Sequence, residues 1–237
     1  MRIVGVGAVR GAPGVTTSAL LLASALPEPT VLLEADLHGG VLAVRYGLGR
    51  EPGLTTLAAA GALAGEGWRE HAQEAGGMAV IVGPDSPDRA RSVWRSAGQR
   101  ISRVLGGCEA TCVVDLGRIE EDVPLTSDMA MLVVLIRPVA EQLVTLSHRL
   151  PALRRHAGHV GVVLVGDGEY RPADVAEAIE VDVLGALPHD PRAAEALVGR
   201  GRASSVNRSQ LSRAIVAVAA SIDAALGPAP LVPEPVS

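Results

Sequence analysis

The segment from Gly5 to Leu26 reads GVGAVRGAPGVTTSALLLASAL and decides the fold. Its apolar start predicts a buried strand, and its end predicts a helix that begins at Thr16. The loop between them contains Gly11, Pro13 and Gly14. Such a loop offers successive backbone amides and a helix amino terminus to a phosphate. We therefore predict a phosphate-binding loop, in which the hydroxyl of Thr16 is placed to reach a magnesium ion.

Two other interpretations of this segment stay open. Gly5 and Gly7 form a GxG pattern that also occurs in dinucleotide-binding loops, but the third glycine is misplaced and Gly5 falls inside the strand. The loop could also be a tight strand-to-helix turn without a ligand. This second interpretation gains weight because Val15 stands immediately before Thr16, where the general P-loop pattern has lysine.

Short apolar runs alternate with helical stretches along most of the chain. Because the runs are solidly apolar, they are typical of strands buried on both faces. The sequence therefore predicts a doubly wound α/β fold with a mainly parallel sheet and helices on both faces. We expect one domain over residues 1–226 and a disordered, proline-rich tail over 227–237. Pro138 and Pro172 are expected at helix starts. The predicted strands are Arg2–Val6, Val31–Leu33, Met78–Val82, Cys112–Val114, Met131–Ile136, Val160–Val165 and Val183–Leu187, and the predicted helices are Thr16–Leu26, Arg89–Leu105, Glu141–Arg155, Ala173–Ile179 and Gln210–Leu226.

Composition narrows the function classes. The chain has 237 residues, 48% hydrophobic and 20% charged, which is typical of a globular protein. All 21 basic residues are arginine, so no lysine elsewhere can replace the one missing from the loop. The formal net charge of -5 argues against general attraction to nucleic acid. No apolar run has the length of a membrane span and nothing resembles a signal peptide, so we expect a cytoplasmic protein.

The residues from Arg10 to Thr17 resemble the deviant Walker A box of the ParA/MinD ATPases, which reads KGGxGKTT. Gly11, Gly14, Thr16 and Thr17 match this box. Arg10 stands at the signature lysine, which reaches across the family's dimer to the partner's phosphates, and Val15 stands at the lysine that contacts the β- and γ-phosphates. The resemblance implies that Gly11, Ala12, Pro13, Gly14, Val15, Thr16 and Thr17 line the nucleotide. The segment VVDLGR, at residues 113–118, resembles the CpaE/TadZ-like branch of this family.

Further segments resemble other boxes of this family. The segment VLLEADLHGG places Asp36 at the aspartate that positions the attacking water, with Glu34 at another family aspartate. CVVDLG resembles the Walker B strand, with Asp115 at the position that holds magnesium through water. LGALPHDP resembles the stretch beside the adenine, which contains Pro188. Asp36 and Asp115 are also placed where carboxylates commonly cap a turn or helix.

The departures from the family pattern bear on ATP binding and hydrolysis. The resemblance implies ATP and magnesium as cofactors, with Asp36 and Arg10 as catalytic residues and Thr16 and Asp115 at the metal. An apolar Val15 removes a charge-assisted contact of about 1.5–3 kcal/mol. Phosphoryl transfer depends on charge neutralisation, so we expect at most a weak ATPase.

The remaining polar clusters carry weaker signals. His148, His156 and His159 lie among arginines, which indicates a solvated basic face or a partner patch rather than a metal site. The pair Cys108 and Cys112 is typical of small core residues. A second basic stretch contains Arg192, Arg200, Arg202, Arg208 and Arg213 and leaves DNA contact open. The chain lacks the basic amphipathic end of MinD-like relatives, so neither membrane nor high-affinity nucleic-acid binding is expected.

Three functions remain open at this level. The first is a ParA/MinD-like spatial-organising or partitioning protein with a degenerate nucleotide site, which acts as a dimeric switch or scaffold that positions a larger assembly. The second is an active ATPase, with Arg10 replacing both lysines, that moves DNA or cargo. The third is a nucleotide-independent binding module. We expect a homodimer and an unidentified protein partner.

Overall fold

A computed structural model describes residues 2–11, 14–27, 29–60, 65–106, 110–120, 129–196 and 209–227. An eight-stranded sheet has the order β3-β4-β2-β5-β1-β6-β7-β8, and all neighbouring strands are parallel except the edge pair β3 and β4. The strands are β1 (Arg2–Ala8), β2 (Thr30–Glu34), β3 (Gln73–Ala75), β4 (Met78–Ile81), β5 (Thr111–Arg118), β6 (Met129–Ile136), β7 (Ala157–Val165) and β8 (Asp182–Leu187).

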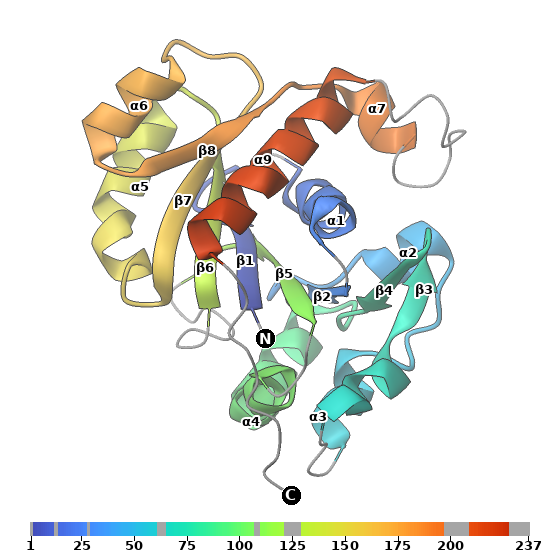
Figure 1. Ribbon diagram of the computed structural model, residues 1–237. Helices are drawn as coiled ribbons and strands as arrows, with labels where there is room; N and C mark the ends of the chain where they lie inside the picture. Colours follow the sequence, from blue (N-terminus) through green and yellow to red (C-terminus); the bar gives the residue numbers. More distant parts are fainter. Residues whose placement is uncertain are drawn as a thin grey trace, which may run out of the picture.

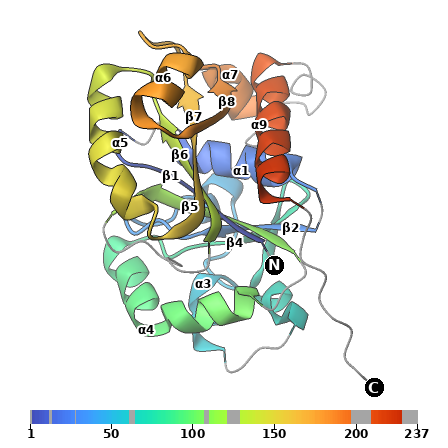
Figure 2. The same ribbon diagram turned by 60° about the vertical axis from the view of Figure 1, so that its left-hand side comes forward.

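Helices cover both faces of this sheet (Figures 1 and 2). The longer ones are α1 (Val15–Ala25), α4 (Pro87–Gly106), α5 (Ala140–Leu153), α6 (Pro172–Ile179) and α9 (Gln210–Leu226). The shorter ones are α2 (Leu42–Tyr46), α3 (Leu54–Ala59), the 3-10 helix η1 (Gly65–His71) and α7 (Pro191–Glu195). The predicted doubly wound, mainly parallel fold is confirmed.

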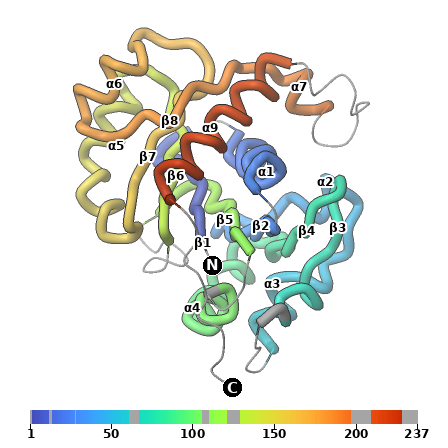
Figure 3. Tube along the Cα trace, viewed as in Figure 1, coloured from blue at the N-terminus to red at the C-terminus, as the bar shows by residue number. Residues whose placement is uncertain are grey.

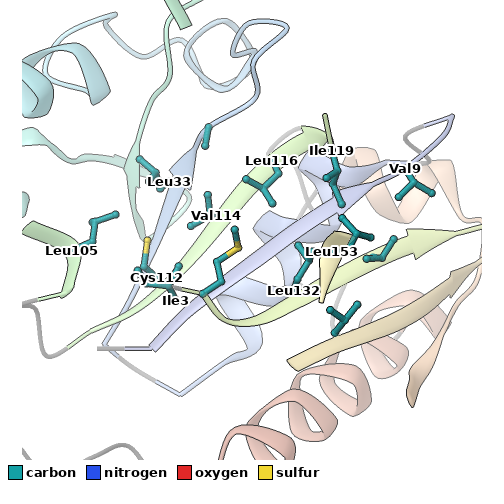
Figure 4. Close-up of a cluster of buried hydrophobic side chains, with 14 of the residues drawn as sticks. Ile3, Val9, Leu33, Leu105, Cys112, Val114, Leu116, Ile119, Leu132 and Leu153 are labelled. Carbon is teal, nitrogen blue, oxygen red and sulfur yellow. The ribbon is translucent and has the colours of Figure 1, made fainter. Parts of the chain in front are cut away.

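The core divides into two apolar clusters, one on each face of the sheet. One cluster joins the sheet to α4, α5 and α6, and includes Leu105, Val114, Leu132 and Leu153 (Figure 4). The other cluster joins the sheet to α1, α2 and α9. Because successive side chains of a strand point to opposite faces, solidly apolar strands supply both clusters at once.

Each predicted strand and long helix exists; the bounds of α9 agree with the prediction, and the ends of the other elements are shifted by a few residues. Helix α1 begins at Val15 rather than Thr16, and α5 ends at Leu153 rather than Arg155. Pro172 is the first residue of α6, as expected, but Pro138 precedes the cap residue Val139 and lies outside α5. The predicted tail lies outside the described residues beyond Gly227, as do Cys108, Arg200, Arg202 and Arg208.

The structure adds β3, α2, α3, η1 and α7, which the sequence analysis did not predict. Each has at most seven residues, too few for a hydrophobic period to emerge. In the described part of the chain, no helix is long and apolar enough to cross a membrane.

Candidate nucleotide site

The glycine loop leads from β1 into the amino terminus of α1. Gly14 caps the helix in a left-handed conformation, with φ 67°. A Cβ on Gly14 would meet nothing within 4 Å, so its backbone conformation is what demands glycine. No side chain caps the helix and its first turn holds no acidic residue. The first amides of α1 are therefore available to an anion. Ala12 and Pro13 lie outside the described residues.

Gly5 and Gly7 both lie inside β1, so they form no dinucleotide loop. A Cβ on Gly5 would overlap Met129, and one on Gly7 would be 2.5 Å from Ile119. These glycines allow neighbouring segments to pack closely on the strand. This packing accounts for the GxG pattern without a ligand.

Val15, at the start of α1, points into the core. Its side chain is only 3% exposed and belongs to the core cluster beneath α1. Thr16 and Thr17, the next two residues, are half-buried at the start of the helix. The glycine loop thus keeps its hydroxyls but has a buried apolar residue where the box that it resembles has lysine.

Asp115 is the most unusual polar residue of the site. It is fully buried in β5, and its Oδ1 accepts a 3.0 Å hydrogen bond from the amide of Gly117. Its Oδ2 is buried without a hydrogen-bond partner among the described residues. Burial raises the pKa of Asp115 to about 7, against the lowering effects of the Thr16 hydroxyl and the Gly117 amide; Glu34 and Asp36 add to the increase.

A bulge in β5 sets this geometry. Asp115 and Gly117 pair with the consecutive residues Val6 and Gly7 of β1, so Leu116 is an extra residue in the ladder. Such bulges redirect neighbouring side chains and occur often beside functional sites.

The donor set of Thr16 and Asp115 fits a magnesium ion. Carboxylate and hydroxyl oxygens are the ligands that Mg²⁺ prefers, usually with several waters retained. The unpartnered Oδ2 of Asp115 is a buried acceptor beside the Thr16 hydroxyl. A bound Mg²⁺ would neutralise phosphate charge, and Thr16 and Asp115 would hold it.

Asp36 follows β2 and joins the same edge of the sheet. Its carboxylate is 22% exposed, and its Oδ1 accepts a 2.8 Å hydrogen bond from the amide of His38. The ring Nδ1 of His38 lies 3.2 Å from the same oxygen. Asp36 is close enough to Asp115 to raise the pKa of that residue. The structure therefore brings Thr16, Asp36 and Asp115 together, as the sequence predicts.

A chain of charges beyond Asp36 was not predicted. His38 Nε2 lies 3.0 Å from Glu120 Oε1, and Glu120 accepts hydrogen bonds of 2.7 and 3.1 Å from Arg91. This pair with Arg91 is the main cause that lowers the pKa of Glu120. Arg149 donates to the backbone oxygens of Ile119 and Glu120 at 2.9 and 3.1 Å. Together these contacts tie the loop after β2 to the segment after β5.

Glu34 has a structural place beside the site. Its carboxylate accepts backbone hydrogen bonds from Val41 (2.6 Å), Leu42 (2.9 Å) and Gly83 (2.9 Å). Burial nevertheless raises the pKa of Glu34. Glu34 therefore organises the loop that carries Asp36 and fixes the start of α2.

A cavity of about 290 Å³ adjoins the glycine loop. Gly14 and Thr17 form one side, and Arg137, Pro188 and His189 contribute to the others. Its size suits part of a small ligand. Pro188, the predicted neighbour of the adenine, thus lines the same cavity as the phosphate loop, whereas Arg137 and His189 were not predicted.

Arginines are distributed unequally around the loop. Arg10 is exposed and has no ion pair within the described ranges, so the structure does not bring it to a carboxylate. Arg45 of α2, which was not predicted, places Nη1 3.4 Å from the Thr17 hydroxyl. A cation from outside the loop thus contacts this hydroxyl group.

The other predicted clusters form no site. His159 pairs with Asp182 at 3.1 Å, and the described residues contain no group of three or more His, Cys, Asp or Glu that could hold a metal ion. Cys112 is buried and belongs to the core cluster beneath α4, as the sequence predicts for a small core residue.

Comparison with solved structures shows the fold of the ParA/MinD ATPases. A ParA family ATPase from Chlorobium tepidum is 18% identical, with TM-score 0.77 over 94% of this chain and 98% of that chain. The septum site-determining protein MinD from Pyrococcus horikoshii, complexed with Mg-ADP, is 16% identical, with TM-score 0.75 over 94% and 96%. MinD in the MinC:MinD cell division complex of Aquifex aeolicus is 13% identical, with TM-score 0.70 over 98% of both chains. No family model matches the sequence, and no curated protein matches it significantly.

Proposed function

We propose that this chain is a ParA/MinD-like spatial-organising or partitioning protein with a degenerate nucleotide site. It acts as a dimeric switch or scaffold that positions a larger assembly through a protein partner. Its structural relatives include a ParA family ATPase and MinD proteins, one of them in complex with MinC. Residues 1–226 form its working domain.

The observation that carries this proposal is the unpartnered Oδ2 of Asp115. A fully buried carboxylate oxygen without a partner is costly when it is ionised, and a bound cation would remove that cost. It lies beside Thr16 at an uncapped helix start, which supports Mg-nucleotide binding. A strand-to-helix turn without a ligand would not require a buried, unpartnered carboxylate oxygen at this position.

We expect slow turnover because the loop lacks a cation. Valine carries no charge, and the side chain of Val15 is buried in the core. Phosphoryl transfer needs charge neutralisation, so we expect the protein to bind nucleotide but to hydrolyse it slowly.

The experiment measures three quantities on the full chain: binding of Mg-ATP and Mg-ADP, phosphate release, and molecular mass in solution. We expect binding that requires magnesium and is weakened by Asp115→Ala, with phosphate release near background. Rapid turnover that Asp36→Ala abolishes would instead identify an active ATPase. A protein that binds neither nucleotide would be a nucleotide-independent module.

A further inference from the structure

We propose that Arg45, on the short helix α2, supplies the cationic phosphate contact that Val15 removes from the glycine loop. The inference rests on the proposed function, because it needs a nucleotide at that loop. Its starting point is the 3.4 Å separation between Arg45 Nη1 and the Thr17 hydroxyl. Thr17 is in the first turn of α1, where the helix offers unpaired amides.

Helix α2 is anchored at its start, which fixes the origin of this side chain. The carboxylate of Glu34 binds the amides of Val41 and Leu42 at the start of α2. Leu42 is fully buried, and Tyr46 packs on the same apolar cluster as α1. In Figure 3, α1 lies between α9 and α2. Arg45 therefore reaches Thr17 from an anchored helix.

The contact between Arg45 and the Thr17 hydroxyl is weak enough to be given up for a contact with phosphate. It is long, exposed and made to a neutral hydroxyl, so it contributes little by itself. A guanidinium is always charged and presents five donors, and it binds phosphate oxygens in pairs. A phosphate at Thr17 would therefore replace a weak contact with a strong one.

A second arginine lies in the neighbourhood of the loop. Arg137 lines the 290 Å³ cavity together with Thr17 and Gly14. Its backbone amide donates to Gln142 Oε1 at 2.8 Å, and Gln142 Nε2 would lie 3.5 Å from a Cβ on Gly11. Gln142 thus links the turn that carries Arg137 to the glycine loop.

This arrangement has a mechanical consequence. A lysine in the loop would bind phosphate without involving any other element. Arg45 instead belongs to α2, whose start is tied through Glu34 to the loop that carries Asp36. A phosphate held by Arg45 would therefore restrain both α2 and the loop that carries Asp36, because Glu34 links the two.

The test compares nucleotide affinity in the full chain and three variants. A fluorescent ADP analogue with magnesium is titrated into the wild type, Arg45→Ala, Arg45→Lys and Arg155→Ala. Arg155 is the matched control, an exposed arginine just after α5 whose Nη1 donates to the Pro151 carbonyl of that helix. We expect Arg45→Ala to raise Kd at least tenfold, because a charge-assisted hydrogen bond is lost. Arg45→Lys should retain part of the affinity, and Arg155→Ala all of it.

Inorganic tripolyphosphate tests whether the contact is to phosphate. It should displace the analogue from the wild type and need about tenfold higher concentration with Arg45→Ala. Equal affinities of wild type and Arg45→Ala would overturn the inference and leave the proposed function standing. A wild type that binds no nucleotide would overturn both. Unchanged thermal unfolding of Arg45→Ala without ligand shows that any loss of affinity is not loss of fold.

Discussion

The carboxylate of Asp36 packs directly on the backbone of Gly117. A Cβ on Gly117 would overlap both the carboxyl carbon and Oδ2 of Asp36, and Gly117 has a φ of 56°. The same glycine donates its amide to Asp115. One residue of β5 thus sets the positions of both aspartates, one by leaving space and the other by a hydrogen bond.

Gly117→Ala should therefore cost more stability than its backbone conformation alone requires. Gly76 is the matched control, because its φ is 59° and a Cβ there would meet nothing within 4 Å. We expect Gly76→Ala to lose about 1 kcal/mol through strain. Gly117→Ala should lose a further 1–3 kcal/mol or so through overpacking. Urea unfolding of both variants measures the difference, and equal losses would show that Asp36 simply moves aside.

The raised pKa of Asp115 predicts how stability depends on pH. The unfolded chain ionises this group near its ordinary value of 3.8, whereas the folded protein ionises it at about 7. Between these values the folded state holds the extra proton, so its stability falls as pH rises and stays lower above about pH 7. A shift of about three pKa units corresponds to about 4 kcal/mol.

Asp115→Asn removes the ionisable group and should remove that dependence. Without magnesium, the variant should unfold at higher urea concentration than the wild type at pH 8, and at a similar concentration near pH 4. Asp167→Asn, which removes an exposed carboxylate, is the control. Parallel pH profiles of wild type and Asp115→Asn would contradict the prediction.

Much of this site was predictable because its parts follow from position in the sequence. In a parallel sheet, residues at the carboxyl ends of strands meet at one edge, so the order of elements predicts that Asp36 and Asp115 lie beside the glycine loop. The position of Pro188 beside the loop was predicted from the family resemblance. The long strands were equally clear, since burial on both faces leaves a solid apolar run.

The unpredicted residues act through contacts that sequence order does not encode. Arg91 meets Glu120 across 29 positions, and Arg45 meets Thr17 across 28. Each is one of 21 arginines with no local pattern to mark it. Arg10, in contrast, stands at the signature-lysine position of the box that the loop resembles, but its side chain has no ion pair in the part of the chain that the structure describes. Which arginine serves the loop depends on how α2 packs, and α2 has only five residues.

Val15→Lys should lower the stability of the folded protein and raise its affinity for Mg-ATP. The residue is buried, so a lysine there must extend its charge out of the core toward the phosphates at the expense of packing. We expect a loss of about 1–3 kcal/mol without ligand and a tighter Kd for Mg-ATP. Val15→Met, of similar length and without charge, separates the two effects. A Kd for Val15→Lys that does not improve on Val15→Met would favour a vestigial site.

The last prediction concerns assembly through the glycine-loop face. Val41, which caps α2, and Val44, within α2, are 44% and 84% exposed and flank the region of the arginine that contacts Thr17. Exposed apolar side chains grouped at a ligand site are typical of an interface. We expect a homodimer through this face, with Arg10 at its border, because the family resemblance implies a face-to-face pair.

Val44→Glu should weaken that dimer at least tenfold, since a carboxylate would be buried without a partner. Val144→Glu is the matched control, because Val144 is 56% exposed on α5, on the opposite face of the sheet. Light scattering at micromolar concentration, with and without Mg-ATP, measures the mass of each variant. A strict monomer in both conditions would end the idea of a dimer. If Val144→Glu alone dissociated the dimer, the interface would lie at α5 instead. If the dimer tolerated Arg10→Ala but not Val44→Glu, its stability would come from the valines rather than from Arg10.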